Sequence, residues 1–201
     1  MLMKEANLPV AFKVVNILTG EHKKEPYITI NPAGTIPAFV DGDFKLAEGA
    51  AILVYLCETH GLSQWYPTDP QARAKVNQWL HWHHTGTRKS TRHILGPSLH
   101  DASEIDTTQL ATSLPVLEST LANSKFVASQ DHPTIADLFL LPELDQLGGD
   151  FHMGECLFDW SPYPNVERYI MDLIHALPSY AQNKAVAVAI MNMATASKLK
   201  T

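Results

Sequence analysis

Ile36-Pro37 and Glu48-Gly49 are the residues of this 201-residue sequence whose types and spacing point most directly to chemistry. An X-Pro bond adopts the cis form at low cost. A cis bond here would turn the backbone edge of Ile36 outward, ready to pair with an extended peptide. Glu48-Gly49 stands where a long apolar run begins, and the free N–H groups of a helix N-terminus attract carboxylates. Each feature alone is also typical of an ordinary strand boundary or helix end.

The surrounding pattern predicts the elements that must position these residues. Apolar runs at 36–40 and 44–47, joined by a turn at Asp41-Gly42, indicate a β-hairpin. The apolar run from Glu48 contains no turn residue before Gly61, which predicts a helix that ends there. Upstream, the β-branched residues at 10–18 predict another strand, followed by a polar loop.

The stretch from Asn31 to Leu56 resembles the N-terminal half of the glutathione transferases, in particular their theta-like branch. That family's pattern is N-P-x-G-x-[VI]-P-x-[LF]-x-D-x-x-x-L-x-E-S, followed by an A-I-x-x-Y-L helix, and this sequence matches nearly all of it. The resemblance implies an α/β plus all-α glutathione transferase fold. A thioredoxin-like domain would occupy residues 1–61, a linker residues 62–70 and an all-helical domain residues 71–201.

Glutathione is the co-substrate that the resemblance implies. Its cysteinyl backbone would pair with Ile36, beside a cis Pro37, and its γ-glutamyl end would lie at Glu48 and Gly49. A histidine loop near the glycyl carboxylate corresponds to His22, although its charged neighbours also fit a solvated loop. The glutathione-binding residues predicted in this way are His22, Lys23, Thr35, Ile36, Pro37, Glu48, Gly49 and Asn77.

Three departures from the family pattern affect this site. Gly49 replaces a serine, and a lost hydrogen bond to a charged ligand group costs about 1.5–3 kcal/mol. Asn77 stands where the family often has an aspartate that reaches the γ-glutamyl amine across a dimer interface. The serine that activates the glutathione sulfur would fall before Met1, so we assign no catalytic residue. An unassisted thiol, with a pKa of about 8.5, is mostly protonated at neutral pH.

The family's first strand would also precede Met1, and it is central in the family's sheet, between the strands predicted at 11–18 and 36–40. We expect one of two outcomes. The strand at 11–18 closes up beside 36–40, or the sheet keeps an unpaired edge, which invites association.

The second half of the chain shows helix signals. Asp69-Pro70 suits a helix start, and the predicted helix continues over 71–84. Pro115 should bend or end a helix whose apolar stripe is Leu110, Leu114, Leu117 and Leu121. Thr134-x-x-Asp137 is a capping box, and Asn165 is expected to cap a further helix.

Two polar clusters have functional and structural interpretations. His81 and His84 share a helix face with His83 close by, but no carboxylate or cysteine stands at ligand spacing, and zinc needs three or four ligands. We therefore predict no metal site. Arg88 and Arg92 could hold an anionic substrate or glutathione itself, or they could form a solvated face.

The composition of the chain limits its possible partners and cellular compartment. A net charge of −6 argues against nucleic acid or an anionic membrane as partner. Two cysteines, Cys57 and Cys156, cannot form a disulfide framework, which favours a reducing, cytoplasmic compartment. There is no signal peptide or membrane-spanning run. The resemblance implies a homodimer that conjugates glutathione thiolate to small hydrophobic electrophiles. The alternatives are a non-catalytic binding or structural member, or a shortened form of an active enzyme.

Overall fold

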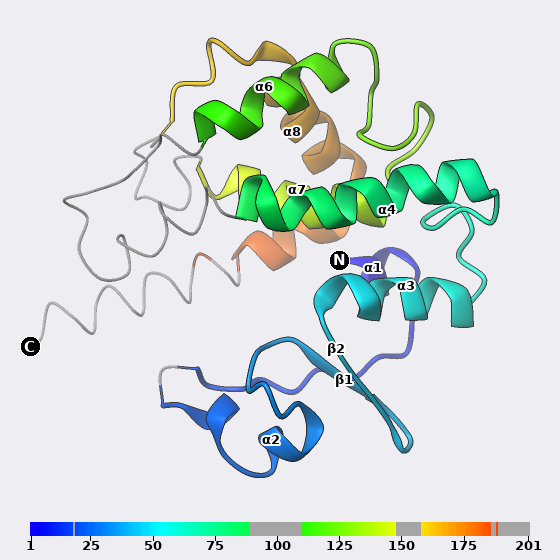
Figure 1. Ribbon diagram of the computed structural model, residues 1–201, viewed down its shortest axis with the longest axis vertical. Coiled ribbons are helices and arrows are strands. Elements are labelled where there is room, and N and C mark those ends of the chain that lie inside the picture. The colour runs from blue at the N-terminus through cyan, green and yellow to red at the C-terminus, as the bar shows by residue number, and fades with distance from the viewer. Residues whose placement is uncertain (18, 89–109, 148–157, 186–187, 189–201) are drawn as a thin grey trace, which may run out of the picture.

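The structure, a computed structural model, describes residues 1–17, 19–88, 110–147, 158–185 and 188. Arg92 and Cys156 lie outside these residues. Figure 1 shows a helical part built around α7, with the hairpin and the short elements of the first 61 residues on one side of it. Helix α3 lies between the two parts, which gives the arrangement expected of the predicted two-part fold.

The N-terminal elements are small. They are α1 (Leu2–Glu5), the 3₁₀ helix η1 (Glu21–Lys23), α2 (Tyr27–Ile30), β1 (Ala38–Asp41), β2 (Phe44–Ala47) and α3 (Gly49–Thr59). Strands β1 and β2 pair antiparallel, with Ala38 opposite Ala47 and Asp41 opposite Phe44. Gly42 adopts the left-handed φ of +57° that this tight turn requires. The predicted hairpin and helix are therefore confirmed, although β1 begins later than expected.

The strand predicted at residues 10–18 is wrong. Residues 10–16 belong to no helix or strand, so the sheet in the described part of the chain has two strands. Phe12 is 70% exposed and Val14 87% exposed. β-branched residues favour extended backbone, but a strand also needs a neighbour with which to pair. Of the two expected outcomes, the sheet has the unpaired edge.

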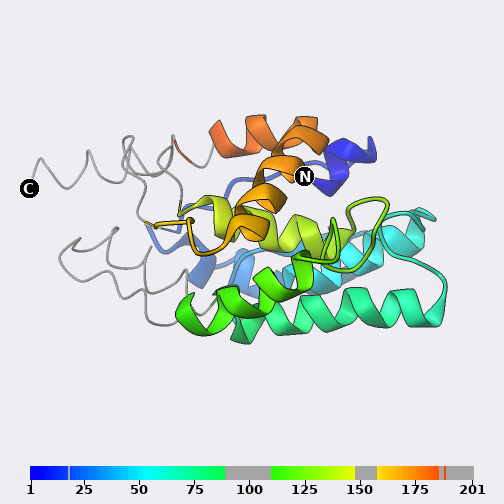
Figure 2. The same ribbon diagram turned by 90° about the horizontal axis from the view of Figure 1, so that it is seen from above.

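The helical part consists of α4 (Pro70–Thr85), α6 (Leu110–Leu121), α7 (Ile135–Asp145), α8 (Pro164–Ala176) and further helical turns at 178–185. Helix α7 is the central element, since it contacts α3, α4 and α8. Figure 2 shows it between α4 on one side and α8 on the other. One apolar core runs through both parts: Leu2, Ile52 and Leu56 belong to the same buried cluster as the leucines of α6 and α7.

Helix ends in this part follow local chemistry, with two differences from expectation. The Asp69 side chain accepts hydrogen bonds from the first turn of α4, and the predicted capping box at Thr134 is present. Helix α6 continues through Pro115 instead of ending there. Asn165 does not cap α8 but lies within its first turn. The side chain of Glu118, from α6, takes the place of a cap, since it accepts the N–H groups of Asn165 and Val166 at 3.0–3.2 Å.

None of the helices that the structure describes has the length and apolar character needed to cross a bilayer.

Candidate functional site

The loop from Asn31 to Pro37 is held in shape from within. The buried Tyr27 hydroxyl donates to the Thr35 carbonyl at 2.6 Å, and the Asn31 amide donates to the same oxygen at 2.8 Å. Burial raises the pKa of Tyr27, so its phenol remains a proton donor. The Ile36-Pro37 bond is cis, as predicted, and Ile36 is 51% exposed. The loop therefore presents an accessible backbone edge at Ile36.

The N-terminus of α3 adjoins this edge. Gly49 opens the helix, and a Cβ placed on it would lie 3.7 Å from Cγ of Pro37. Glu48 is the N-cap residue with a left-handed φ of 70°, and its side chain makes no capping hydrogen bond. Among the described residues, no side chain is therefore seen to cap the first-turn N–H groups. They are a place where a carboxylate gains favourable interactions with the helix dipole.

At the other end of the loop lie His22 and Lys23, both of which the sequence predicted as ligands. The Lys23 ammonium donates to the Ala33 carbonyl at 3.2 Å. A Cβ on Gly34, which has a φ of +56°, would lie 2.9 Å from the His22 carbonyl oxygen. Glycine is needed here because η1 packs so closely on the loop. Nδ1 of His22 is buried and finds no hydrogen-bond partner in the described part of the chain. A cationic end, a backbone edge and a helix N-terminus therefore follow one another from Lys23 to Gly49.

Phe139 of α7 completes the site, and the sequence did not single it out. A Cβ on Gly49 would lie 2.9 Å from Cζ of Phe139, closer than real Cβ contacts allow. The ring thus occupies space that a serine side chain at position 49 would enter, so a serine there would require the ring to shift. Phe139 packs in turn edge-on against His83, with ring centroids 4.8 Å apart. No local pattern could have revealed a contact that joins the two parts of the chain.

Asn77 and Arg88, two further predicted ligands, have partners within the chain. The Asn77 side-chain oxygen accepts a hydrogen bond from the Tyr66 hydroxyl at 3.0 Å. Arg88 pairs with Glu143 at 3.1 Å, and Glu143 also lies 3.0 Å from Nδ1 of His83. His83 is therefore a buried partner of a carboxylate. The described residues contain no group of three metal-binding side chains.

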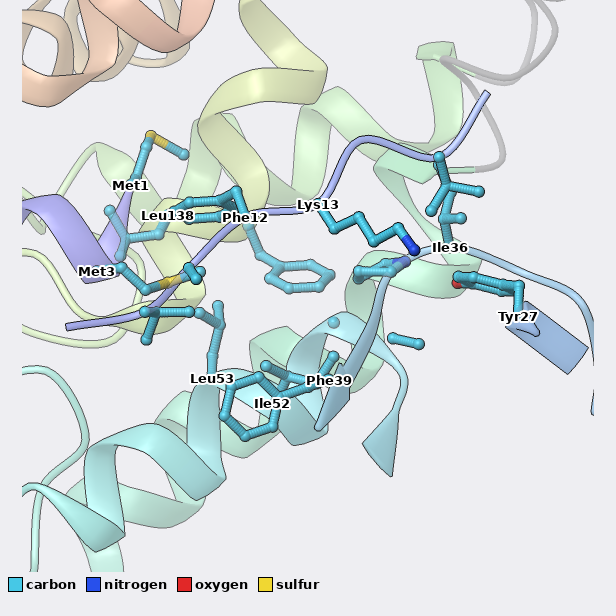
Figure 3. A pocket seen from close by; sticks show the side chains of 17 residues that line it. Met1, Met3, Phe12, Lys13, Tyr27, Ile36, Phe39, Ile52, Leu53 and Leu138 are labelled. Carbon is cyan, nitrogen blue, oxygen red and sulfur yellow. The ribbon is translucent and has the colours of Figure 1, made fainter. Parts of the chain in front are cut away.

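An apolar cavity of about 460 Å³ opens beside Ile36 and Pro37. Figure 3 shows Phe39, Ile52 and Leu53 on one side of it and Leu138 on another, with the Phe12 ring directed into it. Both parts of the chain therefore line it. The site as a whole can hold an extended, doubly anionic peptide along a backbone edge, with apolar surface adjacent.

Comparison with known proteins agrees with this geometry. Residues 1–58 match the family model "Glutathione S-transferase, N-terminal domain". The chain is 34% identical to human glutathione S-transferase theta-2B over 171 residues, which cover 79% of this chain and 68% of that protein. It is 32% identical to a Hyoscyamus muticus glutathione S-transferase over 192 residues, covering 90% of this chain and 88% of the relative.

A solved structure of the human theta-class transferase, in complex with the glutathione conjugate of 1-menaphthyl sulfate, superimposes with a TM-score of 0.82. The two are 29% identical, and the match covers 98% of this chain and 84% of that one. The chain spans about two thirds of the length of its mammalian theta-class relatives. Similarity of sequence over most of the chain and similarity of fold agree, and the chain belongs to the glutathione S-transferase family.

Proposed function

We propose that this protein binds glutathione along the 31–37 loop and conjugates it to small hydrophobic electrophiles. The observation that carries the proposal is the alignment of three features on one edge. They are the Lys23 ammonium, the exposed backbone at Ile36 and the uncapped start of α3 at Gly49. Glutathione has a carboxylate at each end and an extended backbone between them, which is the complement of this arrangement.

In this arrangement the γ-glutamyl carboxylate lies at the first-turn N–H groups of α3, where the helix dipole favours it. The cysteinyl backbone pairs with Ile36. The glycyl carboxylate lies near Lys23, with His22 beside it. Gly49 carries no hydroxyl, so at this position the γ-glutamyl end depends on backbone donors.

The test compares two ligands and two lysines. Calorimetry would measure binding of glutathione and of γ-glutamylcysteine, which lacks the glycyl residue. We expect Lys23→Gln to weaken glutathione binding about three- to tenfold at low salt, since it removes one exposed charge interaction. γ-Glutamylcysteine should bind the variant and the parent equally. Lys24→Gln is the matched control, because Lys24 donates to the Thr19 carbonyl and not to the loop.

Two results would contradict this binding mode. One is the absence of glutathione binding at millimolar concentration. The other is an equal effect of Lys23→Gln on both ligands, which would place the glycyl end somewhere else.

Conjugation is tested by the dependence of its rate on pH, with an aryl or alkyl halide as electrophile. The thiolate attacks the carbon and the halide leaves. A thiol that keeps its pKa of about 8.5 gives a rate that rises about tenfold per pH unit between roughly pH 6 and 8. A plateau below about pH 7 would reveal an activating group in the protein. No conjugation above the protein-free rate would favour the non-catalytic alternative.

We also propose that the protein is a cytoplasmic homodimer. Support comes from the family, whose members are usually dimers, and from the low cysteine content. Sedimentation at micromolar concentration should give twice the monomer mass, and a monomer would refute the assignment.

A further inference from the structure

Helices α4 and α7 pack side by side (Figure 1 and Figure 2), and the rings of His83 and Phe139 meet between them. The two ring planes stand at 88° to each other, with centroids 4.8 Å apart. His83 is buried, whereas Phe139 keeps part of its surface exposed. An edge-on contact between rings is favourable beyond the area that it buries, so the buried ring supports the half-exposed one.

Polar partners fix the orientation of the His83 ring. Its Nδ1 lies 3.0 Å from Oε2 of Glu143 and 3.3 Å from the Thr87 hydroxyl. Glu143 is buried, stands one helical turn after Phe139 on α7, and accepts a hydrogen bond from Arg88 through its other oxygen. Taking a partner away from a buried carboxylate is costly, so the imidazole is held firmly at its polar side.

The Phe139 ring reaches from α7 to the start of α3. A Cβ on Gly49 would lie 2.9 Å from Cζ and 3.3 Å from Cε2 of this ring, and Gly49 is the first residue of α3. The ring therefore covers one side of the first helical turn. A partly buried helix N-terminus holds a carboxylate several-fold more strongly than an exposed one, because water and salt screen it less.

We propose that His83 is a positioning residue for glutathione, which holds the Phe139 ring against the first turn of α3. The ring then shields the γ-glutamyl carboxylate from water. This inference rests on the proposed binding of glutathione along the 31–37 loop. It adds a residue of the helical part that sets the affinity through Phe139 and not by contact with the ligand. A His83 that served only to pair with Glu143 would affect stability and leave that affinity unchanged.

The experiment measures glutathione binding by calorimetry in a double-mutant cycle. His83→Gln removes the ring but keeps a side-chain donor for Glu143, and it should weaken binding about three- to tenfold. Phe139→Leu should weaken binding by a similar factor. The double variant should bind no more weakly than the weaker single variant, because both changes act through the same ring. In conjugation assays the loss should appear in KM and not in kcat. His81→Gln, at an exposed histidine of the same helix, is the matched control and should bind as the parent does.

The Gly49 amide resonance of the ligand-free protein gives a second readout, since a neighbouring aromatic ring displaces it. His83→Gln should move this resonance toward its position in Phe139→Leu. The same change in the Phe139→Leu background should leave it in place. Thr87→Val, which removes only the hydroxyl beside Nδ1, is the milder variant to use if His83→Gln does not fold. It should act in the same direction, with an about two- to threefold loss of affinity.

Two results would overturn this role while the parent binds glutathione. One is an unchanged affinity in His83→Gln, whatever the Gly49 resonance does. The other is a double variant whose loss is the product of the two single losses, which would mean that His83 does not act through Phe139. A parent that binds no glutathione would overturn the proposed function and this role together, and it is recognised because the His81→Gln control then fails as well.

Discussion

The surroundings of Asp137 and the surroundings of β1 are opposites within one chain. Asp137 is fully buried, and its two oxygens accept hydrogen bonds from the Thr134 backbone and hydroxyl, the Val127 N–H and the Tyr169 hydroxyl. Near β1, by contrast, Val40 and Phe44 are almost half exposed and Val14 is 87% exposed. One region has a partner for each buried polar atom of its central carboxylate, whereas the other leaves a sheet edge open.

The contrast indicates which part of the chain contributes most to the free energy of unfolding. The helical part buries its own stripes around α7. The first 61 residues have a hairpin and short helices, and a two-stranded sheet is marginal by itself. Their apolar residues gain burial mainly by docking on the helical part, through Leu2, Ile52 and Leu56 and through the contact of Gly49 with Phe139. Changes near Asp137 should therefore unfold the whole molecule, and changes in the open segment should cost little.

Asp137→Ala should have the largest effect on the free energy of unfolding. It leaves the Val127 and Thr134 N–H groups and the Tyr169 hydroxyl buried without an acceptor, at about 1–3 kcal/mol each. We expect a loss of about 3–6 kcal/mol in urea unfolding, a large share of a domain's stability. Asp131→Ala, at an exposed acid, is the control and should change stability by less than about 0.5 kcal/mol. Similar losses in the two variants would remove the distinction between the regions.

Tyr169→Phe should cost about 1.5–3 kcal/mol, because it removes one hydrogen bond to a carboxylate. It also changes the response to alkali. Burial, followed by the nearby charge of Asp137, raises the pKa of Tyr169 well above its usual value. The resulting stability is fully present below about pH 10, the unfolded pKa, and is lost above it by up to about 1.4 kcal/mol per pH unit. The thermal unfolding temperature should therefore fall more steeply with rising pH, between about pH 9 and 11, for the parent than for the variant.

Sequence predicted the local parts of this molecule well. The hairpin turn, the capping box at Thr134 and the start of α4 at Asp69 depend on neighbours within a few residues, and each was found. The cis bond at Pro37 was anticipated from the family pattern. The wrong predictions concern structure that depends on residues far away in the sequence. Residues 10–18 have the composition of a strand, but the described residues place no strand beside them. At the start of α8, the side chain of Glu118, from α6, accepts the N–H group of Val166, whereas Asn165 was expected to be the cap.

The candidate site shows the same limit. Among the predicted residues, His22 and Lys23 lie against the 31–37 loop and Gly49 lies beside Pro37. Phe139 was not predicted as a site residue, because nothing in a single sequence says which side chain fills the space beside Gly49. Its role depends on how α7 docks on α3.

Gly49→Ala tests the contact that joins the regions. The added Cβ would meet Phe139 at 2.9 Å, so we expect a loss of about 1–3 kcal/mol from overpacking. In the Phe139→Leu background the same change should cost at least about 0.5 kcal/mol less, since the ring is gone. Denaturant unfolding of the four proteins in this cycle measures the coupling. An additive cycle would mean that Phe139 moves away freely when Gly49 is replaced. The ring would then not account for Gly49 standing where the family has a serine.

Val14→Ser should have the smallest effect, and it tests the open side of the comparison directly. Val14 is 87% exposed, so replacing its methyl groups removes almost no buried surface. We expect a change of less than about 0.5 kcal/mol in urea unfolding. The matched variant is Val76→Ser in α4, where the same replacement at a fully buried valine creates a cavity and buries a hydroxyl, for about 2–4 kcal/mol. A loss of more than about 1 kcal/mol for Val14→Ser would mean that residues 10–17 pack against another surface in solution.

A cost of Val14→Ser that grew with protein concentration would identify that surface as a second copy of the chain, since a dimer contact contributes to stability by mass action.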